Sequence, residues 1–93
     1  MIKKMSREND NQFEAELYNQ LLDQYGPLLY GDKLRKCLGY PTMMALRQAV
    51  QRGAAPGFIF SIEHRRGKFA LTKDVAHWLA EMRQQAKREK TEI

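Results

Sequence analysis

Glycine and proline residues break the middle of this 93-residue chain into short segments, and these breaks fix where helices can end. Gly26-Pro27 ends a preceding helix, because proline has no amide hydrogen and restricts the residue before it. Gly39 and Gly53 each follow a short helical pattern, at the place where a left-handed helix stop favours glycine. The middle of the chain is therefore predicted to consist of short elements joined by tight turns.

An amphipathic helix precedes the first break. Phe13, Leu17 and Leu21 recur every four residues, which is the spacing of one helix face. The pattern predicts a helix that begins at Gln12. Residues 1–11 are polar and lack this period, so we expect them to form a mobile N-terminal arm.

Two short helical patterns come next. Asp32 has the chemistry of a helix cap and predicts the start of the first one. The second opens at Pro41, with Thr42 or the neighbourhood of Tyr40 supplying its cap. Two short helices across a glycine-containing turn predict a helix-turn-helix over residues 32–53. Its inward faces are expected to carry Leu34, Cys37, Leu38, Met43, Leu46, Ala49 and Val50.

Strand-forming residues follow the second helix. The segment 58–63 is rich in β-branched and aromatic residues, and the segment 68–71 is expected to form a second strand behind it. Residues 28–30 are also expected to be extended. Between the first two segments lies His64-Arg65-Arg66-Gly67, with glycine where a hairpin turn needs a positive φ. The pattern predicts a β-hairpin over residues 58–71 with a basic tip.

A final helix is predicted over residues 72–83. We expect Thr72 to cap it, and Asp74 lies in its first turn, near the positive end of the helix dipole. Beyond it the chain is wholly polar, so residues 84–93 are expected to fray into a charged tail. The apolar stripe of this helix consists of Val75, Trp78, Leu79 and Met82, which makes Trp78 a predicted core residue.

These elements predict a mainly α fold with a small β-hairpin, an α+β class with one domain over residues 12–83. The composition, 43% hydrophobic and 29% charged, is that of a globular protein. No apolar run approaches the ~18 residues that a membrane span needs. The first residues also lack a hydrophobic signal core. We therefore expect a cytoplasmic protein without a membrane partner.

Positive charge is concentrated in the middle of the chain, although the net charge is only +5. Residues 32–69 carry eight Lys/Arg and two Asp/Glu, which gives +6. Residues 1–31 carry −2 and residues 70–93 carry +1. Basic charge gathered on one structural unit is what a polyanion-binding surface needs, because neutralised phosphates release condensed counterions. An ordinary solvated basic surface remains the alternative.

Metal binding and catalysis have little support in the sequence. Cys37 is the only cysteine, and His64 and His77 are well separated, so zinc ligation of the usual spacing is not expected. Neither histidine has a carboxylate, serine or cysteine at a useful spacing for general acid–base or nucleophilic chemistry. We expect no enzyme activity and no cofactor, with Cys37 acting as a small buried hydrophobe.

An ordered set of residues spans positions 28–80, namely Leu28-Leu29, Leu34, Leu38-Gly39, Leu46, Ala49-Val50, Arg52-Gly53, Pro56, Phe58, Ile62, Gly67-Lys68-Phe69, Val75 and Trp78-Leu79. In this order and spacing the chain resembles the winged-helix DNA-binding domains of the excisionase and MerR-like group. It departs from the group at Gly31-Asp32, where Thr or Ser is usual, and at Gly39-Tyr40-Pro41, where Gly-Val-Ser is usual. The interval from Gly39 to Gly53 is also about one residue longer than in the group. The resemblance therefore does not determine which positions of the second helix face the bases.

The whole chain is also similar to the pyocin activator family of small phage-type regulators. There, a helix that ends in a stretch like Gln24-Tyr25-Gly26 precedes the same helix-turn-helix and wing. The resemblance implies a nucleoid-associated protein that binds double-stranded DNA. No length remains for the coiled coil and effector site of full MerR regulators, so no small-molecule effector is expected.

The resemblance assigns three groups of DNA-binding residues. Arg47 and Gln48 are the best candidates for base contacts in the major groove, where Arg and Gln can bind purine edges with two hydrogen bonds. The wing is expected to contact the backbone or the minor groove. The recognition helix offers Thr42, Arg47, Gln48, Gln51 and Arg52, the wing offers His64, Arg65, Arg66 and Lys68, and phosphate contacts are expected from Lys33, Arg35 and Lys36.

Two further readings stay open at the level of sequence. A recombination directionality factor of the excisionase kind would use the same DNA-binding surface as a transcriptional regulator. A protein-interaction adaptor would instead use the stripe of Phe13, Leu17 and Leu21, which exposes more apolar surface than a small winged helix needs. The same stripe could join two copies in a homodimer suited to two-fold DNA sites.

Overall fold

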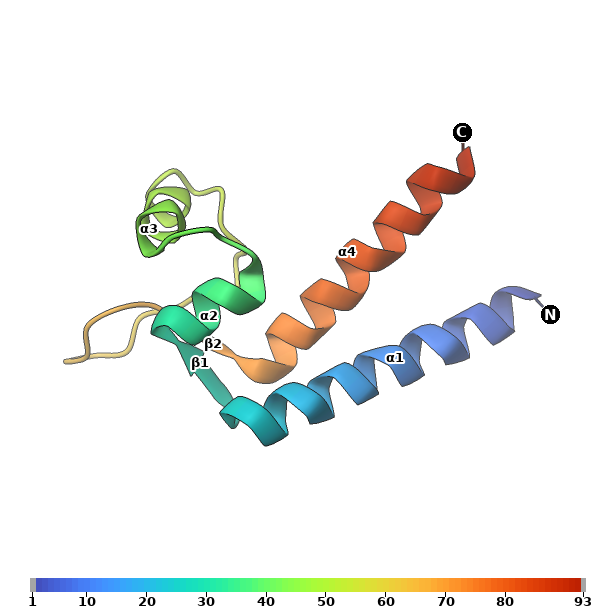
Figure 1. Cartoon of the computed structure of the whole chain (residues 1–93), viewed down its shortest axis with the longest axis horizontal. Helices are drawn as coiled ribbons and strands as arrows, with labels where there is room; N and C mark the ends of the chain where they lie inside the picture. Colours follow the sequence, from blue (N-terminus) through green and yellow to red (C-terminus); the bar gives the residue numbers. More distant parts are fainter. Residues whose placement is uncertain (1, 93) are drawn as a thin grey trace.

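The computed structural model describes the backbone of residues 2–92 and the side chains of residues 11–89. Within these residues the protein is mainly helical, with four helices and one two-stranded antiparallel sheet. Figure 1 shows α1 and α4 side by side with both chain ends at the same end of the molecule, and α2 and α3 at the other end. The elements are α1 (Ile2–Tyr25), β1 (Leu28–Tyr30), α2 (Gly31–Leu38), α3 (Met43–Gln51), β2 (Phe69–Leu71) and α4 (Thr72–Glu92).

Both long helices extend beyond their predicted bounds. α1 begins at Ile2, so residues 2–11 are helical where the sequence predicted an irregular arm. α4 continues to Glu92, so the predicted fraying after Arg83 is wrong. Neither segment contains glycine or proline, and both contain Lys, Arg and Glu, which are good helix formers, so a helix can propagate without an apolar period. Met1 and Ile93, the outer ends of the predicted arm and tail, lie outside the described residues.

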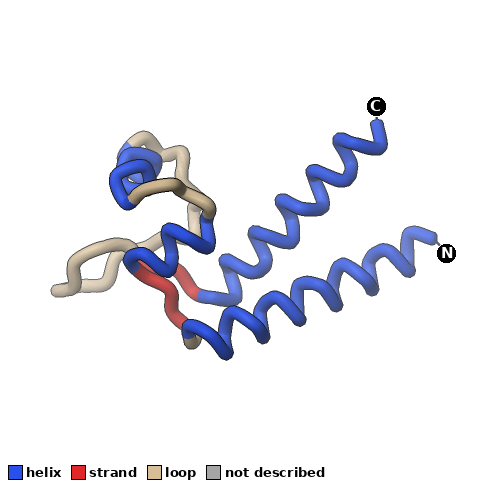
Figure 2. The backbone as a smooth tube through the Cα atoms, viewed as in Figure 1, coloured by secondary structure: helices blue, strands red, loops and turns tan. Residues whose placement is uncertain are grey.

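The small sheet pairs two segments that are distant in sequence. β1 is extended as predicted, but β2 pairs with β1 over its whole length and with residues 58–63 at one position only. That segment forms a loop with a single bridge, Phe60 to Phe69, so the predicted two-stranded hairpin is wrong over most of its length (Figure 2). Leu29 and Ala70 are opposite each other and fully buried, so pairing with β1 places both in the core. The register is Leu28↔Leu71, Leu29↔Ala70 and Tyr30↔Phe69.

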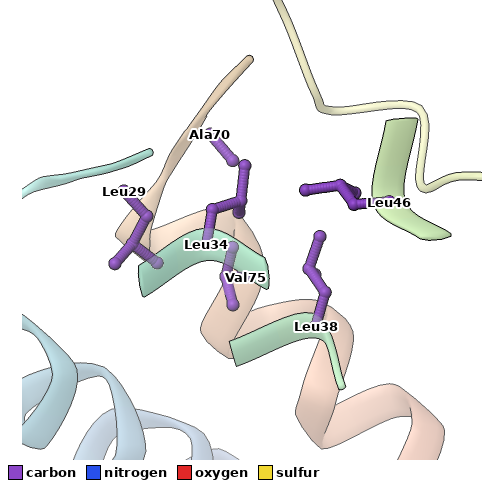
Figure 3. Close-up of a cluster of buried hydrophobic side chains, with 6 residues drawn as sticks. All are labelled: Leu29, Leu34, Leu38, Leu46, Ala70 and Val75. Carbon is purple, nitrogen blue, oxygen red and sulfur yellow. The ribbon is translucent and has the colours of Figure 1, made fainter. Parts of the chain in front are cut away.

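The hydrophobic core lies where α2, α3, the sheet and the first turns of α4 meet. Trp78 packs against it as predicted, with its ring edge-on to Phe58 at 6.4 Å between centroids. Cys37 is half-buried and also contacts this cluster, and burial raises the pKa of its thiol. Figure 3 shows the central side chains, which are Leu29, Leu34, Leu38, Leu46, Ala70 and Val75.

A buried hydroxyl joins the end of α1 to the start of α4. Thr72 is fully buried, and its hydroxyl donates to the carbonyl oxygen of Gly26 at 2.6 Å. Its backbone amide donates to the carbonyl oxygen of Pro27 at 2.9 Å. The hydroxyl is thus bonded to the carbonyl oxygen of the residue that follows α1 and does not cap α4. The predicted role of Thr72 as a cap is therefore wrong. Asp74 lies in the first turn of α4, as predicted.

The apolar stripe of α1 is used inside the chain. Phe13, Leu17 and Leu21 are half-buried, and α1 packs along α4. Leu21 contacts the core, and the guanidinium of Arg83 lies 4.1 Å from the centre of the Phe13 ring. Packing within the chain therefore accounts for much of the surface that the sequence suggested for a partner.

Candidate nucleic-acid interface

The turn between α2 and α3 is set by Gly39. Its φ of +84° is the left-handed conformation that the sequence predicted there. The amide of Gly39 donates to the carbonyl oxygen of Lys36, and the amide of Tyr40 donates to that of Arg35, both at 3.1 Å. These two bonds form the Schellman pattern, which satisfies the last carbonyl groups of α2. The stop fixes the direction in which the chain leaves α2 towards α3.

Arg35 holds this turn in place. Its guanidinium donates to the carbonyl oxygens of Tyr40 and Pro41, at 3.0 and 3.1 Å, and to Asp32 Oδ1 at 2.7 Å. The hydrogen bond from Arg35 lowers the pKa of the Asp32 carboxyl and raises the pKa of Arg35 itself. Asp32 therefore does not cap α2: Tyr30 stands at the cap position without a side-chain bond, and the predicted cap is wrong.

The guanidinium of Arg35 is thus occupied within the protein, which leaves it poorly placed for the predicted phosphate contact. The other two predicted phosphate contacts, Lys33 and Lys36, are exposed on α2. The amine of Lys33 lies 5.9 Å from the centre of the Tyr25 ring, and that of Lys36 lies 3.5 Å from Asp32 Oδ2. Both amines are still exposed to solvent.

α3 begins with a side-chain cap. The hydroxyl of Thr42 accepts a hydrogen bond from the amide of Ala45 at 3.0 Å, which confirms Thr42 as the cap. Leu46 and Ala49 are buried, with 2% and 3% of their surface exposed. This face anchors the helix against the core and turns the opposite face outward.

The outward face of α3 is a single stripe. Met44, Arg47, Gln48 and Gln51 follow one another at helical spacing, and all are exposed. Arg52 is also exposed and forms the C-terminal cap of the helix. The structure therefore brings together the predicted base-contacting residues and adds Met44, whose side chain is 64% exposed. The signal for Met44 was its position, three residues before Arg47 and four before Gln48.

The loop between α3 and β2 carries the second basic group. His64 has φ +65° and Gly67 has φ +94°, so two left-handed residues shape its tip. The amine of Lys68 donates to the hydroxyl of Ser61 at 3.0 Å, across the two arms of the loop. The guanidinium of Arg65 lies over the Phe69 ring at 5.0 Å. Gly67 thus has the predicted positive φ, although the arms are not paired as a full hairpin.

One groove joins the two basic groups. It has a volume of about 560 Å³ and lies between the start of α3 and the loop. Arg47 comes from α3, whereas Arg65, Arg66 and Lys68 come from the loop. Among the described residues that line it, none is acidic. The remaining lining residues are Tyr30, Gly31, Met43, Leu46, Ser61 and Gly67.

The remaining predicted residues lie around this groove and not in its lining. Gln48, Gln51 and Arg52 lie further along the outward side of α3. His64 is exposed at the loop tip, with its Nε2 atom 3.5 Å from Glu63 Oε1. The structure therefore brings Arg47 of α3 together with three loop cations, whereas Arg35 belongs to the turn.

A second hollow, of about 530 Å³, lies between α1 and α4 and contains His77. The Nδ1 atom of His77 lies 3.0 Å from Glu14 Oε1 on α1, and its Nε2 atom lies 3.1 Å from Glu81 Oε1 on α4. The hydrogen bond to Glu14, and then the charge of Glu81, raise the pKa of His77. The sequence prediction that His77 lacks a carboxylate partner is wrong, because Glu81 is one helical turn away and α1 supplies Glu14.

Within the described residues, no group of side chains could hold a metal ion, and no helix is long and apolar enough to cross a membrane. Comparison of the chain with protein-family models, with curated proteins and with solved structures gave no match.

Proposed function

We propose that this protein binds double-stranded DNA in a sequence-dependent way, as a small regulator with a winged helix-turn-helix. α2 and α3 would form the helix-turn-helix, and the loop over residues 58–68 would form the wing. One observation carries the proposal. Arg47 of α3 and three cationic side chains of the loop line the same groove, and none of the described residues that line it is acidic.

The outward stripe of α3 is the proposed base-reading surface. Arg47, Gln48 and Gln51 can donate hydrogen bonds to base edges in the major groove, and Arg and Gln suit bidentate contacts to guanine and adenine. Met44 adds an apolar contact suited to the methyl group of thymine. The opposite face of α3 is buried against the core, so the outward stripe is the side of the helix that would enter the major groove of DNA.

The loop is the proposed positioning element. Arg66 is exposed, and Arg65 and Lys68 have partners that hold them beside the groove. Cations at these positions neutralise phosphates and set the register of the protein on DNA without reading its sequence. Lys33 and Lys36 on α2 would extend the same phosphate contacts.

The test is to select bound duplexes from a random pool and then measure affinity by fluorescence anisotropy. Arg47→Ala with Gln48→Ala is expected to weaken binding of the selected site at least about tenfold, because each bidentate contact contributes ~1–3 kcal/mol of discrimination. Binding of unrelated duplexes should change much less. The matched control is Gln85→Ala with Arg88→Ala, which removes the same side-chain types from the exposed surface of α4.

Unchanged affinity for duplex DNA after Arg47, Gln48, Arg65 and Arg66 are all replaced by Ala would disprove the proposed surface. A transcriptional regulator and a recombination accessory factor would share this surface. A footprint separates them, because the first protects a promoter and the second protects repeats beside a recombination site.

A further inference from the structure

Aromatic side chains lie on one side of the sheet, opposite the buried Leu29 and Ala70. Residues opposite each other in an antiparallel pair point to the same side, and Leu29 and Ala70 point into the core. Tyr30 and Phe69, the next pair, therefore lie on the other side. Phe60 is bridged to Phe69 and shares that side. We call Tyr30, Phe60 and Phe69 the aromatic face.

The two outer rings of the aromatic face are open to solvent. Tyr30 is 48% exposed and Phe60 is 38% exposed, whereas Phe69 between them is only 2% exposed. The Tyr30 and Phe60 rings lie 5.7 and 6.3 Å from the Phe69 ring, centre to centre. Tyr30 and Phe60 thus cover Phe69 and still present aromatic surface outward.

Cations surround these rings. The guanidinium of Arg65 lies 5.0 Å from the centre of the Phe69 ring and 6.0 Å from that of Tyr30. Tyr30 also lines the groove that holds Arg66 and Lys68. Aromatic rings and positive charges therefore alternate over the loop and the sheet, on the side where the described lining carries no carboxylate.

We propose that the aromatic face binds unpaired bases of single-stranded DNA. Exposed aromatic rings and Arg guanidinium groups are the side chains on which single-stranded bases stack, and neighbouring cations neutralise the backbone. In a duplex the base faces are stacked on one another, so only an unpaired base offers a face to Tyr30 or Phe60. An apolar protein partner fits less well, because Arg65 lies at the centre of the face.

This site adjoins the surface proposed to read duplex DNA, because Tyr30 and Arg47 line the same groove. The two share the loop cations but differ in what the rings contribute. Loss of aromatic stacking should therefore affect single strands selectively. Loss of Arg47 and Gln48 should affect the selected duplex selectively.

The experiment measures binding of a labelled oligothymidylate to the full chain by fluorescence anisotropy over a range of salt concentrations. Tyr30→Leu with Phe60→Leu keeps apolar cover over Phe69 but removes both stacking surfaces. We expect this variant to bind the single strand about tenfold more weakly, with the difference persisting at high salt because stacking is not screened. Its affinity for duplex DNA should change less.

Two controls separate stacking from other causes. Tyr30→Phe keeps the ring and should retain the affinity of the wild type for the oligothymidylate. Leu71→Ala removes exposed aliphatic surface from the same side of the sheet, where Leu71 is 41% exposed, and should also bind normally. The thermal midpoint of each variant shows that it is folded.

The proposal fails if the single strand does not bind, or if the double leucine variant binds it like the wild type at high salt. It also fails if Leu71→Ala weakens binding as much as the double variant does, because general apolar contact would then explain the effect. A dimer in sedimentation experiments that the double variant dissociates would assign the face to a second copy of the chain. Each of these results leaves the duplex proposal to be judged by its own variants.

Discussion

The guanidinium of Arg35 donates to the carbonyl oxygen of Tyr40 at 3.0 Å, and this bond ties α2 to the segment that leads into α3. A second bond reaches Pro41 at 3.1 Å. One side chain on α2 thereby sets where the proposed recognition helix begins. The position of α3 against the core is fixed from its other side by Leu46.

Replacement of Arg35 by Gln is therefore expected to lower stability and duplex affinity together. The turn loses its bonds to two carbonyl oxygens, so the thermal midpoint should fall by a few degrees and α3 should be less well placed. Circular dichroism and anisotropy measure the two effects. Arg88→Gln, on the exposed surface of α4, is the control and should leave both the midpoint and the duplex affinity unchanged. Weaker binding by Arg35→Gln at unchanged stability would instead make Arg35 a phosphate contact.

The buried hydroxyl of Thr72 gives a test of how α1 and α4 are joined. Thr72→Val keeps the shape of the side chain but leaves the carbonyl oxygen of Gly26 without its hydroxyl partner. We expect a loss of about 1–2 kcal/mol in the free energy of unfolding, measured with urea. Thr72→Ser keeps the hydroxyl and should retain the hydrogen bond. Equal stability of the valine variant and the wild type would show that the bond contributes nothing.

The pKa of His77 predicts a pH-dependent link between α1 and α4. Protonated His77 can donate to Glu14 and Glu81 at once, while Lys73 and Asp74 also line the hollow around it. Because folding raises the pKa of His77 above 6.5, its contribution to stability is fully present below pH 6.5. The contribution is lost as the pH rises through the raised value.

Thermal unfolding of the wild type and of His77→Gln checks this link. The difference between their midpoints should be largest in mildly acidic buffer and should shrink in alkaline buffer. His64→Gln is the matched control, because His64 lies exposed on the loop and contacts neither long helix. A difference between wild type and His77→Gln that stays constant with pH would contradict the assignment.

Local chemistry predicted the turn between α2 and α3 and the Thr42 cap of α3, whereas the side chains of Asp32 and Thr72 form other hydrogen bonds and do not act as the predicted caps. Thr42 and Gly39 act through bonds to residues at most four positions away, so their roles follow from the sequence around them. The outward face of α3 also follows from its helical period. Met44 was not among the predicted DNA-binding residues, although its place on that face could have been inferred from its spacing to Arg47 and Gln48.

Contacts between residues that are distant in sequence could not be predicted in the same way. β2 lies in a segment that the sequence predicted to be extended, but its partner is decided by which pairing buries Leu29 and Ala70 together. His77 and Glu14 are 63 positions apart and meet only because α1 packs on α4. The role of Arg35 in holding the turn was also not predicted, because two of its three acceptors are backbone oxygens of the turn.

The central claim is that the groove between α3 and the loop neutralises DNA phosphates. The most direct test is the salt dependence of duplex affinity, for the wild type and for Arg65→Ala with Arg66→Ala. The logarithm of the association constant should fall steeply with the logarithm of salt concentration for the wild type. In the variant the slope should be shallower by about 1–2, since each phosphate contact contributes roughly 0.9. A wild-type slope near zero, or the same slope in both proteins, would contradict the claim.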